Sequence, residues 1–196
     1  IVIADEVQPG FGRLGTHFWG HEKIGFTPDV VTIGKPMANG HPVAAIITSS
    51  EIMGQFREGF RYFNTFGGNP VSTAAALATL KVVQEEGLME NARVVGEYAR
   101  DGLRDLASRH TCIGDVRGSG LFFGAEMVLD RATKEPATVF TKRIANAMRQ
   151  RGVLLNFLGV HYNVLKMRPP MPFNRENADH MLGALDAALR DTPLVV

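Results

Sequence analysis

The feature that most constrains the fold of this chain is a pair of short apolar segments that each end in a charged residue. Residues 1–4 are β-branched or small and lead into Asp5. Residues 30–33 are also apolar or β-branched and lead, through a glycine, into Lys35. Such runs are typical of buried strands in a parallel sheet. Because the carboxyl ends of neighbouring parallel strands meet at one edge, we expect Asp5 and Lys35 to face the same crevice.

Hydrophobic periodicity and turn residues predict the elements in the rest of the chain. A third strand is expected at 43–48, and a helix at 71–86 follows Pro70 in a first-turn position. Apolar residues at steps of three and four predict a long helix at 88–110. Beyond it, we expect strands at 113–116 and 121–128, a helix at 139–151, strands at 153–157 and 163–167, and a helix at 174–190.

The change of pattern along the long helix indicates two domains. Residues 1–95 are expected to form the second part of a large parallel-sheet domain, and residues 96–196 a small α+β domain. The predicted fold class is therefore α/β. The chain has no initiator Met and opens within an expected strand, so we interpret it as a fragment of a larger protein.

Composition excludes several classes of partner. Lys and Arg number 21 against 20 Asp and Glu, so the chain has no excess of positive charge for binding nucleic acid or a membrane surface. No apolar run is long enough for a membrane span, and no secretion signal is visible. Cys112 is the single cysteine, so no internal disulfide can form. A cytoplasmic protein with a small-molecule substrate is the expectation.

Asp5 and Lys35 are of the residue types that pyridoxal-phosphate (PLP) enzymes need. An amine holds this cofactor as an imine, and a carboxylate keeps the ring nitrogen protonated. By residue type alone, a surface lysine and a strand-end cap are the commoner roles. The apolar strand that precedes each residue favours a site instead.

Three stretches resemble the class III aminotransferase signature in order and spacing: IVIADEVQPGFGRLG, PDVVTIGKPMANGHPVAA and YFNTFGGNPVSTAAALATL. The segment GDVRGSGLFFGAEM resembles the start of that family's C-terminal domain, so the resemblance runs essentially end to end. It implies the fold type I architecture of PLP enzymes. The implied activity is transfer of an amino group between an amine or amino acid and a keto acid.

The resemblance also implies roles for individual residues. Asp5 would contact the pyridinium nitrogen, Gln8 would lie near the ring hydroxyl, and Lys35 would be the Schiff-base lysine. Thr65 would reach the cofactor phosphate of the neighbouring subunit, which implies a homodimer. Pro9 stands where the family commonly has Thr and touches none of these roles. The family's phosphate loop and ring-stacking aromatic precede these motifs and are absent here, so this chain alone is expected to be incomplete as an enzyme.

Lys166 stands where many family members carry an arginine that binds the substrate carboxylate. A compact ammonium suits a phosphate at least as well as a carboxylate, and Arg168 would share its strand face. NGHPVA, YFNTFGGNPVS and LKMRPPM resemble the phospho-lyase branch of the family, which acts on phosphoethanolamine or phosphohydroxylysine. A phospho-lyase and a non-catalytic fragment that only folds and dimerises therefore remain as alternatives to the aminotransferase.

A literal GxGxxG at residues 10–15 suggests a dinucleotide-binding turn, but its glycines begin well after the strand end and no good helix follows. His17, His21 and Glu22 have helical spacing, yet the glycines around them argue against a helix, and no metal site is expected. Cys112 has no base beside it in the sequence and is interpreted as core filler.

Overall fold

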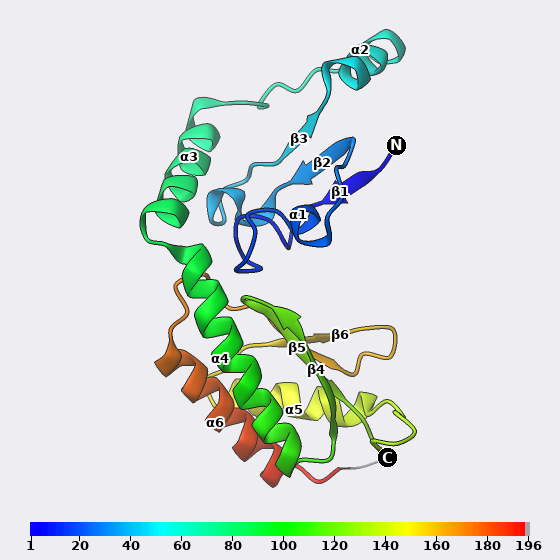
Figure 1. The fold of residues 1–196 in the computed structure, drawn as a ribbon, viewed down its shortest axis with the longest axis vertical. Coiled ribbons are helices and arrows are strands. Elements are labelled where there is room, and N and C mark those ends of the chain that lie inside the picture. The colour runs from blue at the N-terminus through cyan, green and yellow to red at the C-terminus, as the bar shows by residue number, and fades with distance from the viewer. Residues whose placement is uncertain (195–196) are drawn as a thin grey trace. The chain divides into compact units, whose positions relative to one another are not determined.

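The structure, a computed structural model, describes residues 1–194 (Figure 1). The chain divides into two compact units, which we name unit 1, residues 1–89, and unit 2, residues 90–196. The division lies between Met89 and Glu90, whereas the sequence pattern placed the boundary after residue 95.

The sheet of unit 1 has three short strands in the order β1-β2-β3. β1 (Ile3–Asp5) pairs in parallel with β2 (Val30–Ile33), with Asp5 opposite Thr32. This confirms the predicted parallel pair. β3 (Ala45–Thr48) runs antiparallel to β2, because the chain turns back directly after β2 instead of crossing over through a helix.

Three helices and one 3₁₀ turn complete unit 1. α3 (Pro70–Glu85) is the predicted helix, with Pro70 at its start and Asn69 as its N-cap. The turn η1 (Lys35–Ala38) follows β2. α2 (Ser50–Gly59) was not predicted, although Ser49 caps it. It buries no residue, although Ile52, Met53 and Phe56 recur at helical spacing.

The expectation that residues 17–26 form no helix was wrong, because α1 (Gly20–Ile24) lies within them. Gly20 and Gly25 stand at the ends of this short helix and not in its interior. Gly25 closes it in the left-handed region with a φ of 73°, a conformation that glycine adopts without strain.

Unit 2 contains an antiparallel sheet in the order β4-β5-β7-β6. Its strands are β4 (Ile113–Ser119), β5 (Phe122–Met127), β6 (Asn156–Leu158) and β7 (Val164–Met167). The strand predicted at 153–157 starts later, at Asn156. Its first residue, Val153, donates its backbone N–H to Met148 at 3.0 Å and so belongs to the end of the preceding helix.

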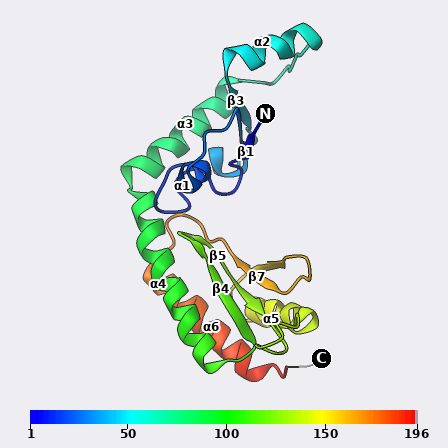
Figure 2. The same cartoon turned by 45° about the vertical axis from the view of Figure 1, so that its right-hand side comes forward.

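Three helices pack with this sheet: α4 (Leu88–Arg109), α5 (Thr138–Gln150) and α6 (Arg175–Asp191). α4 and α6 lie side by side (Figures 1 and 2). The Tyr98 hydroxyl on α4 is 2.5 Å from an oxygen of Asp179 on α6. The largest side chains of the core are buried in this unit: Leu103, Ile113, Leu121, Met127, Phe140, Ile144, Met148, Leu165 and Leu185.

Candidate active site

The ends of β1 and β2 bring the two predicted catalytic residues to one edge of the unit 1 sheet. Asp5 is the last residue of β1, and the backbone N–H of the next residue, Glu6, donates to the Thr32 carbonyl at 2.9 Å. Lys35 follows the end of β2 and is the first residue of η1. Both side chains are exposed, as groups that meet a ligand must be.

The backbone at Lys35 lies in the left-handed region, with a φ of 40°. Asn39, at the end of η1, has a φ of 49°. Non-glycine residues rarely adopt such values, and they persist only where the surroundings hold them in place, often at functional sites. The N–H of Met37 donates to the Gly34 carbonyl at 3.0 Å, and that of Asn39 to Pro36 at 3.1 Å.

A buried hydroxyl ties the segment after Lys35 to helix α3. Ser72 is 6% exposed, and its Oγ lies 3.0 Å from His41 Nε2 and 3.0 Å from Asn69 Nδ2, while it donates to the Pro42 carbonyl at 3.2 Å. A hydroxyl has one hydrogen to donate and two lone pairs. This set is satisfied when His41 carries its proton on Nε2, an assignment that follows from the hydrogen bonds.

Thr65 is exposed in the turn that precedes α3. The same Asn69 that caps α3 fixes this turn, because its Nδ2 donates to the Phe66 carbonyl at 2.9 Å and its Oδ1 accepts from the Ser72 N–H at 2.9 Å. The turn of Thr65 and the segment of Lys35 are therefore attached to one end of one helix.

Gln8 is half-buried in the turn that follows β1. The next stretch, residues 10–15, is a loop in which Phe11 and two glycines have positive φ values. The rings of Phe11, Phe18 and Trp19 pack edge to face, with centroids 4.9 to 5.7 Å apart. A dinucleotide turn needs a helix that starts directly after the strand, and here the first helix begins only at Gly20.

The histidines considered as metal ligands have other partners. His21 Nδ1 lies 2.8 Å from Glu6 Oε1, and His17 Nδ1 lies 3.0 Å from Thr16 Oγ1. Within residues 1–194, no group of three or more His, Cys, Asp or Glu side chains could hold a metal ion. Cys112 is buried, and burial raises the pKa of its thiol, so its surroundings disfavour the reactive thiolate.

The two cations predicted to bind substrate belong to unit 2. Lys166 lies on β7, opposite Gly124 of β5 and Asn156 of β6. Its ammonium is 5.3 Å from the ring centroid of Phe122, a cation–π contact. Arg168 is exposed and follows the last residue of β7.

Sequence interpretation missed three residues of this region: Glu6, His41 and Ser72. The acid that follows Asp5 was a visible signal for Glu6, since a charge directly after a buried strand needs a partner. His41 and Ser72 lie within the NGHPVA and YFNTFGGNPVS segments, but nothing in the sequence shows that they meet, because only the tertiary fold brings them together.

Comparison with known proteins places this arrangement in a family. The model of the family described as aminotransferase class-III matches residues 1–189. An ethanolamine-phosphate phospho-lyase homolog of Caenorhabditis elegans is 47% identical over 96% of this chain and 41% of its own length. The human mitochondrial alanine–glyoxylate aminotransferase 2 is 38% identical over 96% of this chain and 37% of its own length. The chain thus spans about two-fifths of the curated relatives it matches.

Solved structures of similar proteins point to the same family. A phospholyase from Arthrobacter in complex with phosphoethanolamine superimposes with a TM-score of 0.93 at 47% identity, over 97% of this chain and 45% of that one. A Bacillus anthracis aminotransferase gives a TM-score of 0.90 at 32% identity, over 96% of this chain and 44% of that one. These neighbours include PLP-dependent transaminases of fold type I, which confirms the predicted fold class. The chain belongs to the class III aminotransferase family.

Proposed function

We propose that this protein is a PLP-dependent enzyme that transfers an amino group between an amine or amino acid and a keto acid. One observation carries the proposal: Lys35, held in a left-handed backbone, follows β2 at the sheet edge where the parallel strand β1 ends in Asp5. An exposed amine and an exposed carboxylate at one edge fit the two groups that PLP requires. Unit 1 would be part of the large cofactor-binding domain and unit 2 the small C-terminal domain.

Bound PLP supplies an electron sink for the carbanion that forms when a C–H bond beside the amine breaks. Asp5 accepts a hydrogen bond from the ring nitrogen and keeps its proton in place, since a carboxylate favours the charged form of a neighbouring cation. Gln8 donates to the ring hydroxyl. Lys35 would hold the cofactor through its Nζ, and as a neutral amine it would serve as the base that takes the proton from the substrate carbon.

Borohydride reduction of the complete, PLP-loaded protein tests the central assignment. Reduction makes the bond between cofactor and lysine permanent, so the peptide that contains Lys35 should carry the PLP mass. Recovery of the label on another lysine would remove Lys35 from the site. A protein that takes up no PLP at all would support the remaining alternative, a chain that folds and dimerises without catalysis.

A phospho-lyase is the second candidate, and the residue at position 166 favours it. Lys166 offers a compact charge in place of the planar fork of arginine, and we propose that it and Arg168 bind a substrate phosphate. In this reaction Lys35 removes the proton from the carbon bearing nitrogen, and phosphate leaves the adjacent carbon with the bonding electron pair. The similarity to the phosphoethanolamine-bound phospholyase supports this candidate.

Dependence on a keto acid separates the two reactions. The complete protein is offered phosphoethanolamine or phosphohydroxylysine alone, and released phosphate and ammonia are measured. Release without a keto acid indicates the lyase, whereas turnover that needs a keto acid and frees no phosphate indicates the aminotransferase. For the lyase, Lys166→Ala should raise KM for the phosphorylated substrate, and Lys142→Ala, at an exposed position on α5, should leave KM unchanged.

We also propose that the active protein is a homodimer in which Thr65 contacts the cofactor phosphate of the neighbouring subunit. Large aromatic side chains close to Thr65 in the sequence are exposed: Phe56, Phe60, Tyr62, Phe63 and Phe66. Exposed apolar patches of this kind mark interaction surfaces. Thr65→Val should weaken PLP binding, while Thr27→Val, at an exposed position without this role, should not. An active monomer with unaltered affinity for PLP would contradict the arrangement.

The proposed location is the cytoplasm. No helix among residues 1–194 combines the length and apolarity that a membrane span requires. The Arabidopsis thaliana and human relatives are named as mitochondrial proteins. Fractionation of cells that produce the complete protein would decide between the two compartments.

A further inference from the structure

Glu6 is a buried carboxylate directly beside Asp5. It is 1% exposed, whereas Asp5 is exposed. Consecutive residues of an extended strand point to opposite faces, so these two acids leave the sheet edge on opposite sides. A buried carboxylate is unfavourable unless its oxygens are hydrogen-bonded. The hydrogen-bond partners of Glu6 therefore show which parts of the fold this side chain holds together.

Every polar group of Glu6 has a partner. Its Oε2 accepts from the Gly20 N–H at 2.7 Å, and its Oε1 lies 2.8 Å from both the backbone N and the ring Nδ1 of His21. Its own N–H donates to the Thr32 carbonyl at 2.9 Å, and its carbonyl accepts from the Gly10 N–H at 3.1 Å. Glu6 thus joins β1, β2, the loop and the start of α1.

The loop that follows Glu6 is closely packed at its two glycines, Gly10 and Gly20. A Cβ on Gly20 would lie 2.7 Å from the Cβ of Pro9. A Cβ on Gly10 would lie 2.7 Å from the Glu6 carbonyl oxygen and 3.0 Å from the ring of Trp19. Contacts under 3.0 Å force something to shift, so the chain between Glu6 and α1 has little freedom as long as the Glu6 side chain anchors both ends.

This anchor fixes the residues on either side of Glu6. The Val7 N–H donates to Asp5 Oδ1 at 3.0 Å, so the orientation of the Asp5 carboxylate depends on the turn at Glu6. Gln8 leaves the same turn one residue later. We propose that Glu6 is a positioning residue, which acts through Asp5 and holds that carboxylate in the orientation in which it meets the ring nitrogen. The inference rests on the proposed function of Asp5.

A purely structural role would make Glu6 only the cap of α1. In that case its loss would destabilise the loop and α1 without a specific effect on Asp5. The positioning role instead predicts that loss of Glu6 has almost no further effect on catalysis once Asp5 has lost its charge. Two measurements test the proposal: the first needs no cofactor, and the second separates the two roles.

The first measurement is amide hydrogen exchange in the complete protein without PLP. Glu6→Gln keeps the size of the side chain but sets an NH₂ group against a backbone N–H, donor against donor. Exchange at the Val7 amide should accelerate roughly tenfold, the effect of losing about one hydrogen bond to a charged group. Glu85→Gln, at an exposed acid on α3, is the control. Unchanged protection at Val7 would overturn the proposal.

The second measurement is a double-mutant cycle in the PLP-loaded protein. Glu6→Gln should lower kcat roughly tenfold with little change in KM, because the defect lies in the reacting state. In the Asp5→Asn background the same substitution should lower kcat less than about twofold, since interacting residues are not additive. An equal loss in both backgrounds would show a structural role and reject positioning.

A milder variant covers the case in which Glu6→Gln does not fold. His21→Phe removes one hydrogen bond to Glu6 and keeps an aromatic ring beside Phe26, whose centroid is 5.9 Å away. His21→Phe should accelerate exchange at Val7 and lower kcat, each by less than Glu6→Gln does. His21→Asn, which places an amide N–H near the position of Nδ1, should restore activity. If wild type neither binds PLP nor turns over, the proposed function fails, while unchanged exchange at Val7 would show independently that Glu6 does not hold the turn beside Asp5.

Discussion

Units 1 and 2 place their large apolar side chains differently. In unit 2, the buried hydrophobic residues form one cluster that joins α4, α5 and α6 to the sheet. In unit 1, few hydrophobic residues are buried, while Ile1, Ile3, Ile46, Phe63 and Phe66 are among those more than half exposed. Hydrophobic burial is the main favourable term in folding, so unit 2 holds the larger share of the stability within residues 1–194.

Unit 1 is organised instead by polar groups at the edge of a small sheet. Glu6 and Ser72 are buried and make several hydrogen bonds each. Buried polar networks specify one geometry when every member is satisfied, and no buried side-chain N or O atom among residues 1–194 lacks a partner. In unit 1, hydrogen bonds hold a few polar side chains in place, whereas in unit 2 a large apolar core supplies stability.

The largest expected effect separates chemistry from stability in unit 1. Asp5→Asn keeps the shape of the side chain but removes its charge, so kcat should fall about 10³-fold, the order found when one preorganised electrostatic partner is lost. Asp5 is exposed, so the free energy of unfolding should change by less than about 0.5 kcal/mol. Turnover and urea unfolding check both, with Glu51→Gln on α2 as control. Near-full activity would remove Asp5 from the mechanism.

A truncation in each unit tests the difference in cores directly. Leu103 is fully buried in unit 2, and Leu103→Ala should cost about 3 kcal/mol of unfolding free energy through the lost contacts and the cavity. Ile46 on β3 is 64% exposed, and Ile46→Ala should cost less than about 0.5 kcal/mol. Urea unfolding of the complete protein measures both. Equal costs would mean that partners cover Ile46 in the assembled protein.

The fold could be predicted where local signals agree with tertiary packing. The parallel pair β1 and β2 and the helix α3 follow from apolar runs, a proline and a cap. α2 carries a cap, Ser49, and apolar residues at helical spacing, Ile52, Met53 and Phe56, so local signals for it were present and its omission was an error of interpretation. The start of β6 was misplaced because the Val153 amide is used by the end of α5, a contact that hydrophobic pattern does not reveal.

The candidate site was predictable only in part, for a similar reason. The shared edge of Asp5 and Lys35 follows from parallel pairing of the strands that precede them. The contacts of Glu6 with His21 and of Ser72 with His41 join residues far apart in the chain, and only the fold brings them together. The roles of Gln8, Thr65, Lys166 and Arg168 follow from the resemblance, and they stay predictions.

Two glycines in unit 2 give a matched pair of helix substitutions. A Cβ on Gly96 of α4 would lie 2.0 Å from the Gly120 carbonyl oxygen, whereas one on Gly183 of α6 would have no heavy atom within 4 Å. Gly96→Ala should therefore destabilise the protein by about 2 kcal/mol through overpacking. Gly183→Ala should stabilise it by about 0.5 kcal/mol through helix propensity. Thermal unfolding measures both, and the same sign for the two would refute the close contact.

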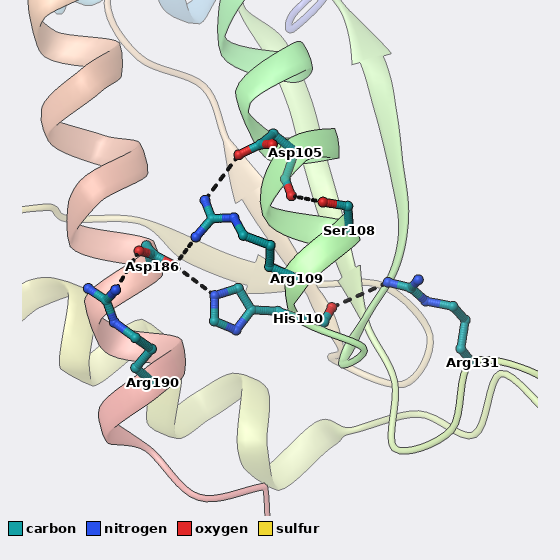
Figure 3. A network of polar contacts seen from close by, with 7 residues as sticks. All are labelled: Asp105, Ser108, Arg109, His110, Arg131, Asp186 and Arg190. Atoms are coloured by element: carbon teal, nitrogen blue, oxygen red, sulfur yellow. Dashed lines mark hydrogen bonds and ion pairs between the residues drawn. The ribbon is translucent and has the colours of Figure 1, made fainter.

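The smallest effect concerns an ion cluster between α4 and α6 of unit 2 (Figure 3). Asp186 lies 2.7 Å from His110 Nε2, 3.1 Å from Arg109 Nη1 and 3.1 Å from Arg190 Nη1. The hydrogen bond from His110, together with the two guanidinium groups, lowers the pKa of Asp186 below its usual value of 3.8. Asp186 is not part of the hydrophobic core cluster of unit 2. The contribution of the ion cluster to stability should therefore be modest, and it should depend on pH because Asp186 titrates.

The sign of this pH dependence follows from the direction of the shift. Because the folded pKa lies below the unfolded value, the carboxylate stabilises the fold above about pH 4, and this contribution is lost as the pH falls through the folded pKa. Asp186→Asn should cost about 1 kcal/mol at pH 7, and the gap to wild type should close as the pH falls through the folded pKa. Urea unfolding across this range checks it. Asp101→Asn, whose pair with Arg104 is exposed, should stay within about 0.5 kcal/mol throughout, and a gap for Asp186→Asn that persists in acid would assign its role to packing instead of charge.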